Sequence, residues 1–325
     1  MSINLENFKP KSENHLLNKM WDNEYGSEFQ KVIKDFSVFL NTNKKLKNLQ
    51  DKLFLNQNNI STDQLNQYIQ SAVELTVVRY FANNYPENFK YEPNLIAGNN
   101  TDVECQFKIN NLTFNIEVKA SKYINDDLKS NDEFYLRAIG MGNLDNYNKG
   151  YNLLKPFLPN LKCEKRYDNS LKSHLTSTQS KLPRENNNDF CNVLIIGCNN
   201  SDDIQNQYHY LFSRDRGFFS ENPLIQHSEF DLVDIIFLSN LFYKHNSEID
   251  ETKLNKESWL FEKSFIVGFR NPYRKSQKLE HLELIESIIP NYTKSFMEYK
   301  GGPDFFRLKH FIHTELGMNR KIYHF

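Results

Sequence analysis

Charged and apolar residues alternate through residues 101–119, and this spacing brings several charged groups to one place. Both halves of the stretch alternate strictly between polar and apolar residues, which is typical of strands with one buried face. An Asn-Asn pair at its middle suits a two-residue turn, because Asn tolerates a positive φ. That turn pairs the two residues that flank it, and counting outward places Glu104 opposite Glu117 and Asp102 opposite Lys119.

Three carboxylates and one ammonium group therefore share one small patch of the expected hairpin. Opposed side chains of neighbouring strands lie about 5 Å apart, and like charges in this position destabilise a sheet. Lys119 offsets only part of the charge of Asp102, Glu104 and Glu117, and a divalent cation would offset the rest. Carboxylate oxygens suit Mg²⁺ or Mn²⁺. The alternative is an amphipathic hairpin whose polar face is simply hydrated.

A long helix is expected before the hairpin. Ser61 and Gln64 have the spacing of a capping box, and apolar residues follow at helical intervals to about Asn84. Glu74 lies within this helix beside the apolar stripe, where an unpaired charge is costly. An ordinary helix residue would give the same pattern.

These residues together resemble the active-site pattern of the PD-(D/E)xK nuclease superfamily, which includes many restriction endonucleases. In that pattern an acidic residue begins one strand and E-x-K lies on the next. Asp102 matches the first acid, and the segment from Glu117 to Lys119 matches E-x-K. Glu74 matches a further Glu that many members carry on the preceding helix. Thr101 stands where the name-giving proline would be.

The resemblance implies metal-dependent hydrolysis of phosphodiester bonds. Asp102, Glu117 and Glu74 would bind Mg²⁺ or Mn²⁺, which polarises the phosphate and activates water. Lys119 would orient or help to deprotonate that water, or stabilise the charge that develops on the phosphate. Glu104 is either a further metal ligand or a solvated strand residue.

Apolar periodicity along the chain predicts an α/β (or α+β) fold with a central mixed sheet. Residues 61–270 would form the restriction-endonuclease-like core, with helical extensions at 1–60 and 271–325. Strands are expected at 193–197, 235–238 and 265–269. Helices are expected around 132–158, 276–289, 292–299 and 304–316, and the chain between 158 and 190 is expected to be looser.

Basic residues after the last expected strand are candidates for contacts with nucleic acid. They are Arg270, Arg274, Lys275 and Lys278, and a second basic run lies within residues 162–184. In a nuclease such clusters would follow the phosphate backbone, although their usual meaning is a solvated face. Gln179 is a loose match to a Gln that some superfamily members carry on the helix after E-x-K.

Composition sets further bounds. The formal net charge of -1 argues mildly against a general nucleic-acid binder, but a local basic groove would suffice. No P-loop is present, so ATP hydrolysis is not expected. The four cysteines form no C-x-x-C pair, and the N-terminus has no apolar leader segment. We expect a cytoplasmic protein with no membrane segment.

The sequence alone therefore predicts a Mg²⁺-dependent endonuclease with DNA favoured over RNA as substrate. By analogy with the superfamily, its setting would be restriction, antiviral defence or repair. Two alternatives stay open: an RNA nuclease such as an effector toxin, and an inactive nuclease-fold protein that serves as a binding subunit of a complex. A homo-oligomer or an activating partner protein is compatible with the predicted endonuclease and with both alternatives.

Overall fold

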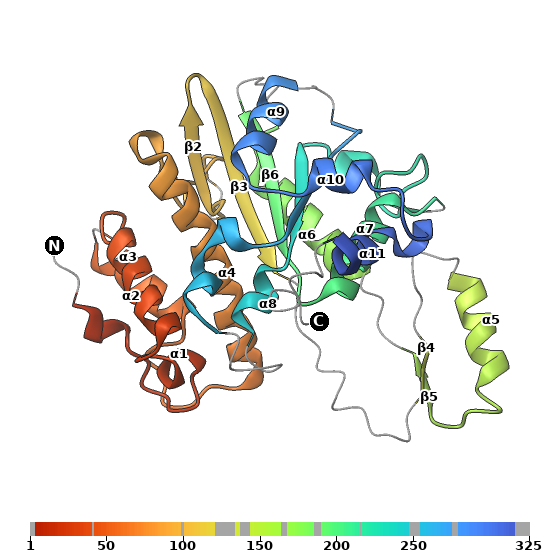
Figure 1. Ribbon diagram of the computed structural model, residues 1–325, viewed down its shortest axis with the longest axis horizontal. Coiled ribbons are helices and arrows are strands. Elements are labelled where there is room, and N and C mark those ends of the chain that lie inside the picture. The colour runs from red at the N-terminus through yellow and green to blue at the C-terminus, as the bar shows by residue number, and fades with distance from the viewer. Residues whose placement is uncertain are drawn as a thin grey trace.

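The protein is built around a six-stranded mixed β-sheet with helices on both faces (Figure 1). A computed structural model describes it over residues 4–40, 42–98, 101–120, 134–136, 144–163, 168–184, 190–214, 216–246, 254–274 and 279–315. The strand order is β1-β2-β3-β6-β7-β8. The predicted α/β class with a central mixed sheet is therefore confirmed.

The sheet combines a parallel centre with antiparallel edges. Its strands are β1 (Lys90–Tyr91), β2 (Cys105–Ile109), β3 (Leu112–Ala120), β6 (Phe190–Gly197), β7 (Ile235–Ser239) and β8 (Ile266–Arg270). β3, β6 and β7 are parallel, whereas β1, β2 and β8 pair antiparallel with their neighbours. The three strands predicted in the second half of the chain are all present. Their near-continuous apolar sequences reflect burial on both faces.

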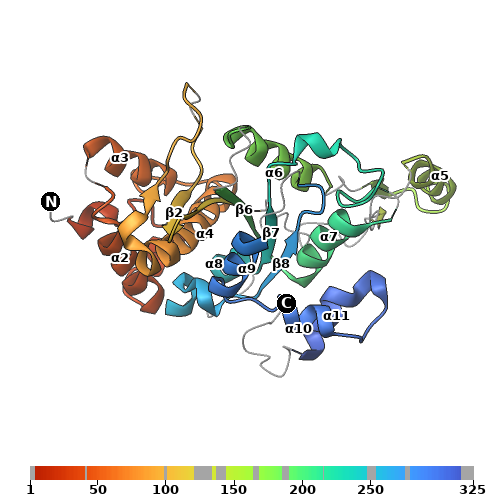
Figure 2. The ribbon, with the colours of Figure 1, turned by 90° about the horizontal axis from the view of Figure 1, so that it is seen from above.

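The central strands alternate their side chains between two hydrophobic cores. Val193 and Ile195 of β6 enter one core, and Leu194 and Ile196 enter the other. We call these the α4-side core and the α6-side core, after the helix that covers each near β3. Figure 2 shows α4, α8 and α9 on one side of the sheet and α6 and α7 on the other.

The α4-side core contains most of the N-terminal residues. Its helices are α1 (Leu16–Lys19), α2 (Glu24–Phe36), α3 (Asn43–Lys52), α4 (Thr62–Asn84), α8 (Leu241–His245) and α9 (Leu279–Ile288). α4 begins with the predicted capping box of Ser61 and Gln64 and ends where predicted. It is buried nearly all round rather than along one stripe, because α2 and α3 cover the side away from the sheet.

The α6-side core contains α6 (Asp168–Lys181), α7 (Ser201–Phe212), α10 (Thr293–Glu298) and α11 (Arg307–Glu315). α6 occupies a stretch that was predicted to be loose, and this prediction is wrong. Leu171, Leu175 and Leu182 are buried at helical spacing and hold α6 on the sheet. No helix in the described ranges is long and apolar enough to cross a membrane.

The helix predicted over 132–158 is replaced by smaller elements. β4 (Phe134–Leu136) pairs in parallel with β5 (Leu161–Cys163) in a separate two-stranded sheet, and α5 (Leu144–Leu154) lies between them in the chain. The predicted helix is therefore wrong at its start, where an aromatic and aliphatic triplet pairs as a strand.

Candidate active site

The C-terminal end of β3 carries the two charged residues of the E-x-K pattern. β2 and β3 pair as predicted, from Ile109 with Leu112 to Cys105 with Ile116. β3 continues to Ala120 and pairs there with β6, so its last four residues have no partner in β2. Glu117 in this extension is 1% exposed, and its Oε1 lies 2.7 Å from Lys119 Nζ. Glu117 and Lys119 are thus in contact, and their role as site residues stays a prediction.

Glu104 departs from the predicted alternation. β2 begins at Cys105, and a bend at Glu104 comes directly before it. The Glu104 carbonyl accepts a hydrogen bond from Glu92 N–H at 3.0 Å, and Glu92 has a φ of 46°. Val103 consequently joins the α6-side core, whereas Glu104 faces α4 in a small cavity. The predicted pairing of Glu104 with Glu117 is wrong, because this bend ends the ladder one residue earlier.

Glu74 lies across that cavity from Glu104. α4 supplies Glu74, and the last residue of α3, Lys52, lines the same cavity. Lys52 also pairs with Glu92, with 2.5 Å between its Nζ and Oε1. Glu117 does not line this cavity, but its charge acts on both Glu74 and Glu104.

A second lysine reaches Glu117 from α6. Lys181, the last residue of α6, places its Nζ 2.6 Å from Glu117 Oε1. Its side chain is only 13% exposed. One carboxylate oxygen therefore receives two ammonium groups, whereas Glu117 Oε2 is buried and has no hydrogen-bond partner among the described residues.

The charges of this cluster act strongly on one another. Burial raises the pKa of Glu104 well above its ordinary value, and the charge of Glu74 raises it further. Burial also raises the pKa of Glu74, while Lys52 and Lys119 lower it. Burial alone would lower the pKa of Lys119, but Glu117 outweighs this effect and that pKa is raised. A further positive charge would therefore stabilise the ionised forms of both glutamates.

Asp102 is not among the charges that act most strongly on Glu74 and Glu104. It is partly buried in the coil before β2. The strongest charge effects on Glu104 come from Glu74, Lys52 and Glu117, not from Asp102. Its predicted role as a metal ligand stays a prediction, and Glu104 is the acidic residue of the first arm that the structure brings to Glu74.

The cluster has the donor chemistry for a hard divalent cation, but not a finished set of ligands. Within the described ranges, no three His, Cys, Asp or Glu side chains form a group that could hold a metal ion. The buried Glu117 Oε2 nevertheless offers an unused oxygen, and Glu74 and Glu104 have carboxyl groups that burial destabilises when ionised. These oxygens fit Mg²⁺ or Mn²⁺.

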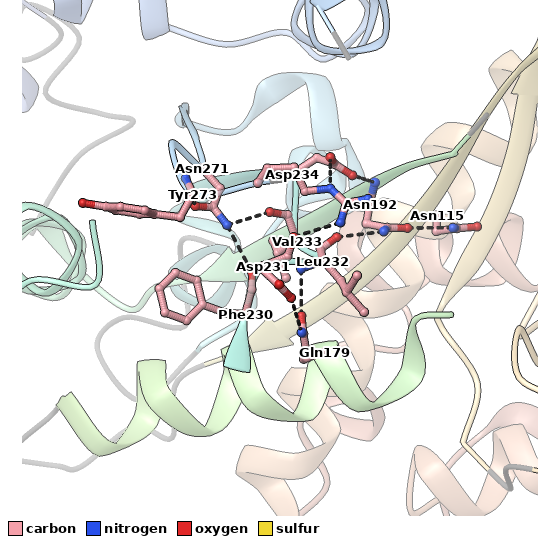
Figure 3. Close-up of polar contacts among 11 residues, drawn as sticks. Asn115, Gln179, Asn192, Phe230, Asp231, Leu232, Val233, Asp234, Asn271 and Tyr273 are labelled. Carbon is pink, nitrogen blue, oxygen red and sulfur yellow. Dashed lines mark hydrogen bonds and ion pairs between the residues drawn. The ribbon is translucent and has the colours of Figure 1, made fainter. Parts of the chain in front are cut away.

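Gln179, two residues before the end of α6, has a structural role. Its Nε2 donates hydrogen bonds to Asp231 Oδ1 at 2.8 Å and to the Ser228 carbonyl at 3.0 Å. Its Oε1 accepts one from Leu232 N–H at 2.9 Å. Figure 3 shows Gln179 on α6 directed toward this loop. Both polar atoms of the Gln179 amide therefore bind the loop before β7.

A row of amides continues this network across the sheet (Figure 3). Gln106 Nε2 donates to Asn115 Oδ1, and Asn115 Nδ2 donates to Asn192 Oδ1, both at 2.8 Å. Asn192 in turn donates to the Leu232 carbonyl. The buried polar side chains of three strands therefore satisfy one another beside Glu117.

The arginines of the predicted phosphate-binding cluster are held by acidic residues. Arg270 forms a two-pronged ion pair with Glu286, at 2.8 and 2.5 Å. Arg274 Nε lies 2.6 Å from Asp234 Oδ1, and its Nη1 donates to the Asp231 carbonyl. The other two members, Lys275 and Lys278, lie outside the described residues. A phosphate contact by either arginine would have to compete with these bonds.

Sequence reasoning missed Lys52 and Lys181 as members of the cluster. Lys181 could have been placed on a helix from the spacing of Leu171 and Leu175, but its contact with Glu117 spans 64 residues of sequence. Lys52 carries no local signal, because only the packing of α3 on α4 brings it to Glu74.

The fold and the cluster define a mixed α/β protein with a buried carboxylate–lysine site at the end of one strand. No protein-family model, no curated protein sequence and no solved structure matches this chain. Arguments about its function therefore depend on the site itself.

Proposed function

We propose that this chain is a metal-dependent nuclease of the PD-(D/E)xK type that hydrolyses phosphodiester bonds in DNA. One observation carries the proposal. Glu117 is buried, with one oxygen shared by Lys119 and Lys181 and the other without a partner in the described part of the chain. A carboxylate that is buried for structural reasons alone would satisfy both oxygens.

The arrangement of elements supports the proposal. A helix that carries Glu74 precedes the hairpin, E-x-K stands at the end of the second arm, and helices cover both faces of a mixed sheet. This is the layout that the resemblance to restriction-endonuclease-like cores implies. We assign to Glu104, which lines the same cavity as Glu74, the role that the sequence pattern alone gives to Asp102.

The chain's own residues have separate tasks in the proposed reaction. Glu74, Glu104 and Glu117 would hold Mg²⁺ or Mn²⁺, an ion that polarises the phosphate and lowers the pKa of bound water. Lys119 stays protonated, because its pKa is raised, so it orients the attacking water and stabilises charge on the phosphate. The Lys119 side chain is 22% exposed, so a phosphate can reach it from the solvent.

Incubation of the purified full-length protein with plasmid, single-stranded DNA and total RNA tests the proposal. Each substrate is given Mg²⁺, Mn²⁺ or EDTA. We expect cleavage of DNA with either metal, none in EDTA, and a loss of about 100-fold or more in Lys119→Ala. Lys47→Ala, an exposed residue of α3, is the matched control and should cleave like the unmodified protein.

The outcomes separate the alternatives. Cleavage of RNA alone would favour an RNA nuclease. Absence of cleavage under every metal would overturn the proposal in favour of an inactive binding subunit. Equal cleavage rates for the unmodified protein and Lys119→Ala would remove this cluster as the active site.

A further inference from the structure

Lys181 and Lys119 make the same contact from different parts of the fold. Both ammonium groups lie within 2.7 Å of Glu117 Oε1. Lys119 is on the same strand as Glu117, two residues away, so the two side chains share a face of β3. Lys181 comes from the end of α6, on a separate element, and its contact can be broken without moving β3.

Each lysine of the cluster already has a carboxylate partner. Lys119 and Lys181 contact Glu117, and Lys52 pairs with Glu92. The nearby imidazole of His174 adds no positive charge at neutral pH, because burial and the charge of Lys119 lower its pKa to about 4. A divalent cation that enters this cluster adds two positive charges and is repelled by the lysines.

We propose that Lys181 takes the electrostatic place of the divalent cation in the metal-free protein and must release Glu117 when the cation binds. This inference rests on the proposed function, because it assumes that the cluster is a metal site. Lys181 is paired with Glu117 in the absence of metal. Its release leaves an ammonium group beside the site, where a phosphate of the substrate can take the place of Glu117 as its partner.

Metal titration of the full-length protein without nucleic acid tests this inference. Binding of Mn²⁺ is measured by isothermal titration calorimetry for the unmodified protein, Lys181→Gln and Lys181→Arg. We expect Lys181→Gln to bind Mn²⁺ about tenfold or more tightly, because one competing positive charge is removed. Lys181→Arg should bind no more tightly than the unmodified protein, because guanidinium also pairs with carboxylate. Lys47→Gln is the control for general loss of positive charge.

Thermal unfolding gives a second readout that needs no activity. Without metal, Lys181→Gln should unfold at a lower temperature than the unmodified protein, since Glu117 loses a partner. Saturating Mn²⁺ should reduce that difference. Unchanged or weaker Mn²⁺ affinity in Lys181→Gln, or tighter binding in Lys181→Arg, would overturn the inference.

The failures of the two proposals are distinguishable. If the unmodified protein cleaves DNA while Lys181→Gln keeps its Mn²⁺ affinity, only the role of Lys181 is wrong. If the unmodified protein binds no Mn²⁺ and cleaves nothing, both the role of Lys181 and the metal-dependent function fail.

Discussion

Glu117 is the side chain on which the proposed site depends. Its two oxygens differ: one accepts hydrogen bonds from two lysines and the other is buried without a partner among the described residues. An unsatisfied buried oxygen costs about 1–3 kcal/mol or more for a charged group. Such a cost is expected where a residue waits for a ligand rather than where it only supports the fold.

A pair of variants decides which acidic residue of the first hairpin arm serves the site. Glu104→Gln should reduce DNA cleavage by about 100-fold or more, because it removes a carboxylate that faces Glu74. Asp102→Asn should reduce it by less than about tenfold, because Asp102 is not among the charges that act most strongly on Glu74 and Glu104. Cleavage rates at saturating Mg²⁺ measure both effects. A larger loss in Asp102→Asn would restore the assignment that the sequence pattern makes.

At the scale of elements, buried polar groups hold the ends of strands and helices in place. The loop before β7 accepts hydrogen bonds from Gln179 of α6 and from Asn192 of β6. It also accepts hydrogen bonds from Asn271 and Arg274, which follow β8. Each of these residues satisfies backbone groups that a buried loop would otherwise leave without partners. The loop thereby fixes α6, and α6 in turn carries Lys181.

The ion pair of Arg274 with Asp234 should matter for stability. Asp234 is 1% exposed, so Arg274→Ala leaves a buried carboxylate with one strong partner fewer, and should lower the free energy of unfolding by about 3 kcal/mol. Arg270→Ala is the matched control, because the pair of Arg270 with Glu286 is more exposed and is worth about 1 kcal/mol or less. Urea unfolding measures both. Equal stability of the two variants would contradict this structural role.

At the scale of the whole molecule, the first 60 residues share a core with the rest of the chain. Tyr25 of α2 packs against Trp259, whose indole N–H donates to the Tyr25 carbonyl. A buried chain of hydrogen bonds joins Tyr68, Tyr25, His245 and Thr76. The division of the chain at residue 60 stays a prediction, but the helices before that point help to cover α4 and therefore help to position Glu74.

Two buried histidines of this shared core must stay neutral. His15 donates from Nε2 to the Leu53 carbonyl and accepts at Nδ1 from Leu17 N–H, so both ring nitrogens are used only in the neutral form. Thr76 donates its hydroxyl proton to the Ala72 carbonyl. Its oxygen therefore accepts from His245 Nε2–H, and His245 Nδ1 accepts from the hydroxyl group of Tyr25.

This arrangement predicts acid sensitivity. Burial lowers the pKa of His15 to about 4 and that of His245 well below its ordinary value. The unfolded chain binds protons at these histidines below about pH 6.5, whereas the folded protein does not, so stability is complete above that pH and falls as the pH drops toward 4. For His15 the loss is about 3 kcal/mol. Urea unfolding at pH 7 and pH 4.5 measures it.

His15→Asn is the variant that separates His15 from other acid effects. Asn can still cap α1 by accepting from Leu17 N–H, but it does not titrate. The difference in unfolding free energy between pH 7 and pH 4.5 should therefore be smaller in His15→Asn. An unchanged difference would assign the acid sensitivity to other groups.

The sequence by itself determined the features that depend on neighbours in the chain. Alternation and a two-residue turn decided the register of β2 with β3, and a capping box decided the start of α4. The contact of Glu117 with Lys119 follows from the same alternation, because residues two apart on a strand share a face. Runs of apolar residues likewise predicted β6, β7 and β8.

Only the tertiary structure decided which further groups join Glu117. The bend that turns Glu104 toward α4 depends on a hydrogen bond from Glu92, and Lys181 reaches Glu117 across 64 residues through the packing of α6 on the sheet. The ion pairs of Arg270 and Arg274 are also long-range. Periodicity and turn chemistry act over a few residues, whereas such contacts depend on how whole elements pack, and no local pattern encodes them.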